Sequence, residues 1–338
     1  MAQSSPGRDF VLPRWDGGLA LGLLAAPNRT LLPKHQPRNC SVIDMLSPEV
    51  LRQIRRLQFR ARRAVEDLLG GEYHSVFKGT GIAFEEVREY QPGDDVRSID
   101  WNVTARMGHP FIKRYVEERE RTVFLLIDWS RSQFFGTGAR EKRDVAAELA
   151  AILAFSAIAN NDKVGLLGFT DRVERFLPAR KGTRHALRLI RDVLYCQPTG
   201  GATSLPEALK FLGRLVHRRA IVFLISDFLD TAFESPLKRA ARAHELIAIR
   251  ISDPREEKLP PIGLVELEDA ETGKRMLVNT AERRLREVFA AEAGKRRDSL
   301  RRLARAARFD LIEVSTDGSH LEALVRFFQE RERRLKRR

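Results

Sequence analysis

The chain has 338 residues, of which 43% are hydrophobic and 31% are charged, a balance that excludes a disordered protein and is typical of a globular one. Lysine and arginine outnumber aspartate and glutamate by 60 to 46, which favours an acidic partner, nucleic acid or an anionic surface, unless the arginines only form solvated helix faces. The two cysteines, Cys40 and Cys196, exclude a disulfide framework and a Cys-x-x-Cys zinc site and fit a reducing compartment, the cytoplasm.

The first 44 residues differ from the rest of the chain in their residue composition and hydrophobic pattern. They contain five prolines and no sustained hydrophobic period, so we expect residues 1–44 to form a disordered leader that is dispensable for folding. The apolar run at residues 17–26 is about half the roughly 20 residues of a membrane-spanning helix. Asp9 and Asp16 lie where a signal peptide is purely basic, so neither a membrane span nor secretion is expected.

A helix is predicted to begin near Met45. Ser47 is a natural N-cap and Pro48 suits a first helical turn. Apolar residues then recur at helical spacing as far as residue 68, before a glycine pair ends the helix. The opposite face carries arginines that either meet solvent or grip phosphates. Residues 45–121 are therefore assigned to an N-terminal helix followed by a charged block.

The charged block, residues 75–116, is dense in acidic, basic and turn residues. Pro92 and Gly93 fit the central positions of a type II turn. Five apolar residues around the turn are expected to fold inward: Val87, Tyr90, Val96, Ile99 and Trp101. The charged residues form either a structural lattice of ion pairs or a docking surface, since exposed ion pairs alone add little stability. The candidate partner-binding residues are Glu85, Arg88, Asp94, Asp95, Arg97, Asp100 and Arg106.

From residue 122 onwards, strand patterns alternate with helical ones. Strands are predicted at residues 123–127, 163–169, 173–177, 220–225, 246–251 and 309–314, and helices at 139–160, 183–195 and 204–217. This alternation predicts an α/β fold, a doubly wound and mostly parallel sheet with helices on both faces, over residues 122–338. Residues 262–268 and 275–279 are expected to form a hairpin at an edge.

Oxygen-bearing side chains cluster where two of these strands end. Asp128 follows one buried strand and precedes Ser130 and Ser132, whereas Asp227 follows another and Thr203 lies in a glycine-rich loop before a helix. Ligands of open α/β sheets lie beyond the carboxyl ends of the strands, so these five side chains are expected to converge. Their oxygens suit a hard cation such as Mg2+. An isolated Asp-x-Ser-x-Ser would as readily cap a helix, so the prediction of a metal site depends on all five side chains together. A second metal site at the acidic residues of the charged block is disfavoured, because nearby arginines compete for those carboxylates.

The five residues resemble the metal-ion-dependent adhesion site of von Willebrand factor A domains. Residues 79–81 (Gly-Thr-Gly), 89–97 (Glu-Tyr-Gln-Pro-Gly-Asp-Asp-Val-Arg) and 99–106 (Ile-Asp-Trp-Asn-Val-Thr-Ala-Arg) resemble the bacterial family called domain of unknown function 58. The resemblance covers about residues 45–338 and implies a von Willebrand factor A-like fold. It also implies Mg2+, with Mn2+ as an alternative, held directly by the hydroxyls and through water by the aspartates. A MoxR-type AAA+ ATPase is the implied partner, with roles in the maturation of protein complexes or metalloenzymes. Members often carry upstream membrane helices, which are not expected here, and Gln133 stands where a methionine commonly follows the second serine.

The sequence therefore predicts a non-enzymatic, metal-dependent interaction module. Neutral hydroxyl ligands leave Mg2+ much of its charge and one open position, which an Asp or Glu of the ATPase or its client would fill. The chain lacks the phosphate-binding motif Gly-x-x-x-x-Gly-Lys-Ser/Thr and the hydrolase motifs Gly-x-Ser-x-Gly and His-Glu-x-x-His. A nucleic-acid-binding protein that uses its arginine-rich helices and a Mg2+-dependent hydrolase are the alternative hypotheses.

Overall fold

The computed structural model describes residues 48–66, 73, 83–116, 120–138, 140–230, 232–269 and 273–336. The leader predicted at residues 1–44, with its expected disorder, lies outside these residues. None of the helices in the described ranges is both long and apolar enough to cross a membrane.

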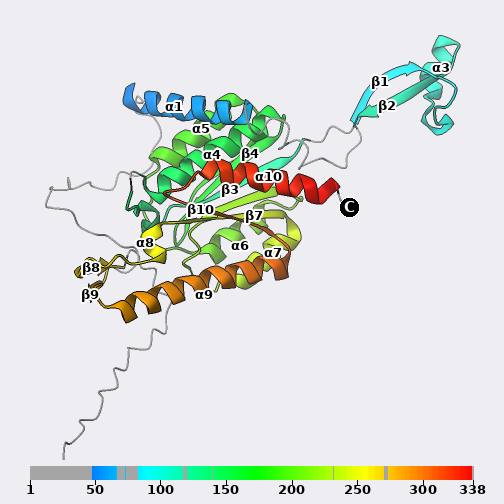
Figure 1. Ribbon diagram of the computed structural model, residues 1–338. Helices are drawn as coiled ribbons and strands as arrows, with labels where there is room; N and C mark the ends of the chain where they lie inside the picture. Colours follow the sequence, from blue (N-terminus) through cyan, green and yellow to red (C-terminus); the bar gives the residue numbers. More distant parts are fainter. Residues whose placement is uncertain are drawn as a thin grey trace, which may run out of the picture.

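A six-stranded sheet forms the centre of the molecule (Figure 1). Its strand order is β10-β7-β6-β3-β4-β5, and neighbours pair in parallel except β5, which is antiparallel to β4. The strands are β3 (Thr122–Asp128), β4 (Lys163–Phe169), β5 (Val173–Arg180), β6 (Ile221–Ser226), β7 (Glu245–Ser252) and β10 (Asp310–Ser315). This topology confirms the predicted doubly wound, mostly parallel α/β fold.

Helices cover both faces of the sheet because its central strands are apolar on both sides. Along β3, Val123, Leu125 and Ile127 belong to one buried cluster, whereas Phe124 and Leu126 belong to the other. The first cluster is covered by α1 (Pro48–Ala64), α4 (Lys142–Ala159), α5 (Thr183–Tyr195) and α10 (His320–Lys336). The second is covered by α6 (Leu205–Leu215), α7 (Glu234–Ala243) and α9 (Arg283–Ala307).

The N-terminal helix α1 is part of this packing. Leu57, Ala61 and Ala64 belong to the same buried cluster as α4, and Arg60 pairs with Glu148 of α4 at 2.6 Å. The helix is described from Pro48 to Ala64, and its predicted start near Met45 and predicted end near residue 68 lie outside the described residues. The arginines of its other face are exposed: Arg52, Arg55, Arg56, Arg60, Arg62 and Arg63.

The charged block forms an arm of its own. β1 (Ala83–Glu89) pairs antiparallel with β2 (Phe111–Val116), and the chain between them forms the short 3-10 helix η2 (Val96–Ser98) and α3 (Trp101–Met107). Figure 1 shows this arm projecting away from the central sheet. Gly93 has a φ of 111°, and the Asp94 amide donates to the Gln91 carbonyl at 3.0 Å, so the predicted turn is present.

The expected inward folding of the arm's apolar residues is wrong for two of them. Val96 is 58% exposed and Trp101 is 67% exposed, whereas Val87, Tyr90 and Ile99 are half-buried. A two-stranded hairpin has no second layer against which larger side chains can be buried. The arm therefore presents an apolar as well as a charged surface.

The second predicted hairpin is present but does not extend the central sheet. β8 (Leu264–Glu268) and β9 (Arg275–Asn279) form a separate two-stranded antiparallel sheet. Leu267 and Val278 pack with Phe135 and Leu259 in a third, small buried cluster. The hairpin is thus attached through side chains, and β5 and β10 are the edges of the central sheet.

We expect Leu57→Ala to lower the free energy of unfolding by about 2–3 kcal/mol, because Leu57 is buried in the cluster that α1 shares with α4. Phe59→Ala is the matched control, since Phe59 on the same helix is 68% exposed and its loss should change stability by less than about 0.5 kcal/mol. Urea unfolding followed by circular dichroism measures both variants. Equal effects would show that α1 does not belong to the core.

Candidate metal centre

The two predicted aspartates lie side by side at one end of the sheet. Asp128 is the last residue of β3 and Asp227 directly follows β6. These strands are parallel neighbours, and their register pairs Ile127 with Ile225. Both carboxylates are only 2% exposed. Strand pairing therefore places two buried negative charges at the carboxyl edge of the sheet, where ligands of such sheets bind.

A chain of hydrogen bonds through two serines links these carboxylates. β3 leads into the 3-10 helix η3 (Arg131–Phe134), with Ser130 as its N-cap and Ser132 within it, and both serines are fully buried. The two Oγ atoms lie 3.0 Å apart, and Ser132 Oγ donates to Asp227 Oδ2 at 2.7 Å. The Ser130 amide donates to Asp128 Oδ1 at 2.9 Å. Hydrogen bonds thus join four of the five predicted site residues.

The fifth residue, Thr203, lies in the loop before α6 and is 8% exposed. This loop is joined to the serine loop by a hydrogen bond from the Arg131 amide to the Gly201 carbonyl, at 3.1 Å. A side chain is excluded at Gly200, where a Cβ atom would lie 2.2 Å from Thr170 Oγ1. Gly200 therefore allows this loop to pack closely against Thr170, and Gly201 lies against Arg131 of the serine loop.

Glu174 of β5 organises the same loop, and sequence reasoning missed it. Its carboxylate accepts hydrogen bonds from the Gly200 amide at 2.7 Å and from the Thr199 hydroxyl at 3.0 Å. Burial alone would raise the pKa of Glu174, but these hydrogen bonds hold it below its ordinary value. Nothing in the sequence distinguishes this glutamate from others on the surface.

A buried cation beside the site was also missed. Lys142, the first residue of α4, is fully buried, and its Nζ donates to Asp227 Oδ2 and to Glu256 Oε1, both at 2.7 Å. Glu256 lies on the short helix α8 (Pro254–Glu257), which follows β7. A signal for this burial was present, because Lys142 shares the helical stripe of Ala146 and Leu149, which face the core.

The charges of the site do not balance. Burial opposes the charge of Lys142, but Asp227 and Glu256 raise its pKa above the ordinary value, so it stays an ammonium. Burial and then repulsion from Asp227 raise the pKa of Asp128 to about 7. Burial also raises the pKa of Glu256, whereas for Asp227 the attraction of Lys142 overcomes burial and lowers the pKa. Three carboxylates face one ammonium, so a divalent cation would complete the neutralisation.

The residues of the site fit a hard divalent ion. Ser130, Ser132 and Thr203 offer neutral oxygens, and the aspartates offer charge, which is the donor chemistry that Mg2+ prefers. Within the described ranges, no group of three or more His, Cys, Asp or Glu side chains is arranged to hold a metal. A metal here would depend on the hydroxyls, and their role as ligands stays a prediction.

The candidate partner-binding residues lie on the arm and not at this centre. The arm precedes the first residue of β3, whereas the candidate metal centre follows the last one, and Figure 1 shows the arm projecting away from the sheet. Arg88 pairs with Asp94 at 2.7 Å, while Asp95 caps η2 and Asp100 caps α3. These acidic residues are therefore engaged by an arginine or by backbone amides and do not form a second metal site.

Two of the candidate arginines lie on the surface of the arm. Arg97 and Arg106 are exposed, and neither forms an ion pair with another described residue. The side chain of Glu85 lies outside the described part. The arm thus carries exposed arginines as well as the exposed Trp101, and both residue types are enriched in protein interfaces.

The strand order and the helices on both faces of the sheet make the fold von Willebrand factor A-like. The family model described as "Protein of unknown function DUF58" matches residues 86–299. "Uncharacterized protein Rv1480" of Mycobacterium tuberculosis is 34% identical over 295 residues, which cover 86% of this chain and 92% of that relative. The chain belongs to this family, as its motifs predicted.

Two solved structures are similar in fold. The "conserved hypothetical protein BatB from Bacteroides thetaiotaomicron" is 17% identical, with a TM-score of 0.40, over 63% of this chain and 99% of that one. The "SpRpn10 VWA domain" is 13% identical, with a TM-score of 0.35, over 61% of this chain and 94% of that one. Likenesses of this size say nothing about function.

Lys142→Met is expected to lower the free energy of unfolding of metal-free protein by about 3–5 kcal/mol, because Asp227 and Glu256 would stay buried without their cation. Guanidinium unfolding in EDTA measures the loss. The double variant Lys142→Met/Glu256→Gln also removes one of the two carboxylates left without a cation, and it should recover part of the lost free energy of unfolding. A double variant no more stable than the single one would show that Lys142 acts through packing alone.

Proposed function

We propose that this chain is a metal-dependent protein-interaction module that binds a carboxylate of its partner. The observation that supports this function is the excess of negative charge around two buried hydroxyls at the carboxyl edge of the sheet. Mg2+, with Mn2+ as an alternative, is assigned to Ser130, Ser132 and Thr203, with Asp128 and Asp227 supplying charge. A metal with neutral ligands would keep the charge that attracts a partner's carboxylate.

The chain's own residues orient these groups before any metal binds. Ser226 Oγ donates to Asp128 Oδ2 at 2.7 Å, and Lys142 together with Ser132 fixes Asp227. Each carboxylate is therefore held in one position by donors that are themselves buried. Such preorganisation lowers the ordering cost of binding. It supports a binding role, and the sequence lacks the phosphate-binding and hydrolase motifs of the rival hypotheses.

The proposed partner is a MoxR-type AAA+ ATPase or a protein client of that ATPase, in the cytoplasm. An acidic side chain of the partner would approach the metal centre, and the arm, with the exposed Trp101, Arg97 and Arg106, would offer a second contact surface. Support for the ATPase comes from the family resemblance and not from the geometry of the site. The geometry of the site supports only the proposed contact between a metal and a carboxylate of the partner.

Mg2+ at ten times its dissociation constant should raise the free energy of unfolding of the wild type by about 1.4 kcal/mol. Ser132→Ala should abolish this response, because it removes a buried hydroxyl of the site without changing the charge. Differential scanning calorimetry with Mg2+ and with EDTA measures it. Ser156→Ala on α4 is the matched control, since its buried hydroxyl has no hydrogen-bond partner among the described atoms. A wild type that is indifferent to both Mg2+ and Mn2+ would refute the site.

Capture of the ATPase or its client is expected to require the metal. Four arms of a pull-down from the protein's own cells test this: wild type with Mg2+, wild type with EDTA, and Ser132→Ala and Ser156→Ala with Mg2+. Capture in the first and last arms only would support a metal-bridged contact, because the two alanine variants each lose one buried hydroxyl. Equal capture in all four arms would place the interface elsewhere, and the arm would then be the next candidate.

A further inference from the structure

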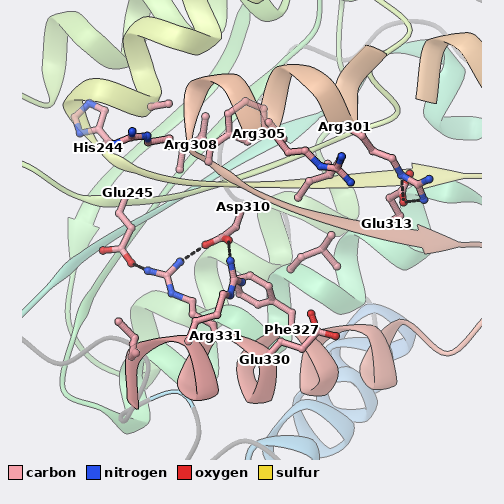
Figure 2. Close-up of a pocket in the computed structure, with 18 of the residues that line it drawn as sticks. His244, Glu245, Arg301, Arg305, Arg308, Asp310, Glu313, Phe327, Glu330 and Arg331 are labelled. Carbon is pink, nitrogen blue, oxygen red and sulfur yellow. Dashed lines mark hydrogen bonds and ion pairs between the residues drawn. The ribbon is translucent and has the colours of Figure 1, made fainter. Parts of the chain in front are cut away.

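A second surface that suits acidic groups lies at the opposite edge of the molecule from β5. A cleft of about 1290 Å3 runs along the outer side of β10, with α9 on one flank and α10 on the other (Figure 2). Helix α9 contributes Arg301 and Arg305 and is capped by Arg308, and α10 contributes Arg331. Figure 2 shows these arginines lying around Asp310 and Glu313 of the strand.

The outer edge of the strand at the floor of this cleft pairs with no other strand of the described ranges. β10 pairs with β7 along its whole length, from Asp310 with Ile247 to Ser315 with Ser252, and it is the last strand of the sheet. In a parallel strand alternate residues direct their backbone N–H and C=O groups to opposite sides. The outer side of β10 therefore offers backbone donors and acceptors to an added strand, which is how many domains bind extended peptides.

The cleft is strongly basic. Eight arginines and four carboxylates line it, and three of the carboxylates already have arginine partners. Arg331 pairs with both Glu245 and Asp310, and Arg301 pairs with Glu313. Three lining arginines are exposed and make no ion pair with another described residue: Arg305, Arg308 and Arg326. The unpaired arginines come from both flanks, because Arg305 lies on α9 and Arg326 on α10.

We propose that this cleft binds an extended acidic peptide segment of a partner protein, which adds as a strand to the free edge of β10. β10 has six residues, so the contact spans a segment of about that length. Side chains of a bound strand would alternate towards α9 and towards α10. Because free arginines stand on both sides, a run of consecutive acidic residues is favoured over acidic residues at every second position.

Nucleic acid fits this surface less well. The four carboxylates of the lining would face phosphates, and Phe309 and Phe327 are each only 7% exposed, so neither offers a ring face for stacking a base. Besides its charge, the cleft offers the backbone edge of β10, and that edge is complementary to a peptide backbone. The backbone edge and the positive charge together favour an acidic peptide over a nucleic acid.

A fluorescein-labelled peptide, Val-Glu-Glu-Glu-Glu-Val, tests the proposal by fluorescence anisotropy with the full chain in EDTA, so that the result is independent of the metal centre. Arg305→Gln/Arg326→Gln should weaken binding about five- to ten-fold, in keeping with the loss of two exposed charge contacts. Arg302→Gln/Arg333→Gln is the matched control: it removes two exposed arginines from the same helices, outside the cleft lining, and should bind nearly as wild type. Hydrogen exchange should show new protection at residues 310–315 when the peptide is bound.

Several results would overturn the proposal. Absence of peptide binding would do so, as would equal affinity for the glutamine analogue Val-Gln-Gln-Gln-Gln-Val. Equal weakening by the control variant would show that only net charge matters. Unchanged exchange at residues 310–315 would exclude strand addition. Tighter binding of a hexauridylate than of the acidic peptide, lost in Arg305→Gln/Arg326→Gln, would make the cleft a nucleic-acid site.

Discussion

The parallel pairing of β3 with β6 sets the central constraint on this molecule. It places Asp128 and Asp227 at the same level of the sheet edge, both buried, where two like charges in a low-dielectric environment repel each other. Lys142 offsets one of them and is itself shared with Glu256. A site built in this way retains negative charge, and the hydroxyls of Ser130 and Ser132 lie next to that charge.

The same lysine connects the site to the loops around it. Glu256 Oε2 accepts a hydrogen bond from the Asp253 amide at 3.1 Å, and the fully buried Asp253 carboxylate accepts from the Thr137 hydroxyl at 2.6 Å and the Thr316 hydroxyl at 2.7 Å. Burial opposes these bonds, but together they lower the pKa of Asp253 below its ordinary value. Its contribution to stability is therefore present above the pKa of an unfolded aspartate and is lost as the pH falls through the folded value. Three chain segments thus meet at one carboxylate, and hydrogen bonds through Glu256 and Lys142 link it to the candidate metal centre.

Much of this architecture was predictable because β3 and β6 are buried on both faces. Continuous apolar runs such as residues 123–127 are typical of strands that lie between two layers of helices, and a hydroxyl-rich loop after such a run indicates a site at the strand end. The pairing of Lys142 with Glu256 was not predictable, since the two residues are far apart in sequence and α8 has only four residues. The exposure of Trp101 escaped prediction for a related reason. Its environment depends on whether the arm packs on the sheet, which local patterns do not encode.

The proposed metal centre and the proposed peptide cleft would select acidic groups by different physics. At the centre the carboxylates and hydroxyls are buried, so a single incoming carboxylate would be largely desolvated, and its contact would be little screened by salt. At the cleft Arg305, Arg308 and Arg326 are exposed. Physiological salt, with a screening length of roughly 8 Å, therefore weakens their attraction for an acidic peptide. Exposed charges of this kind mainly accelerate encounter, whereas a buried contact governs dissociation.

The centre lies beyond the carboxyl ends of β3 and β6, while the cleft reaches Glu245 and Asp310 at the amino ends of β7 and β10. Because these are opposite ends of one parallel sheet, an acidic segment held in the cleft leaves the metal centre open to a second carboxylate.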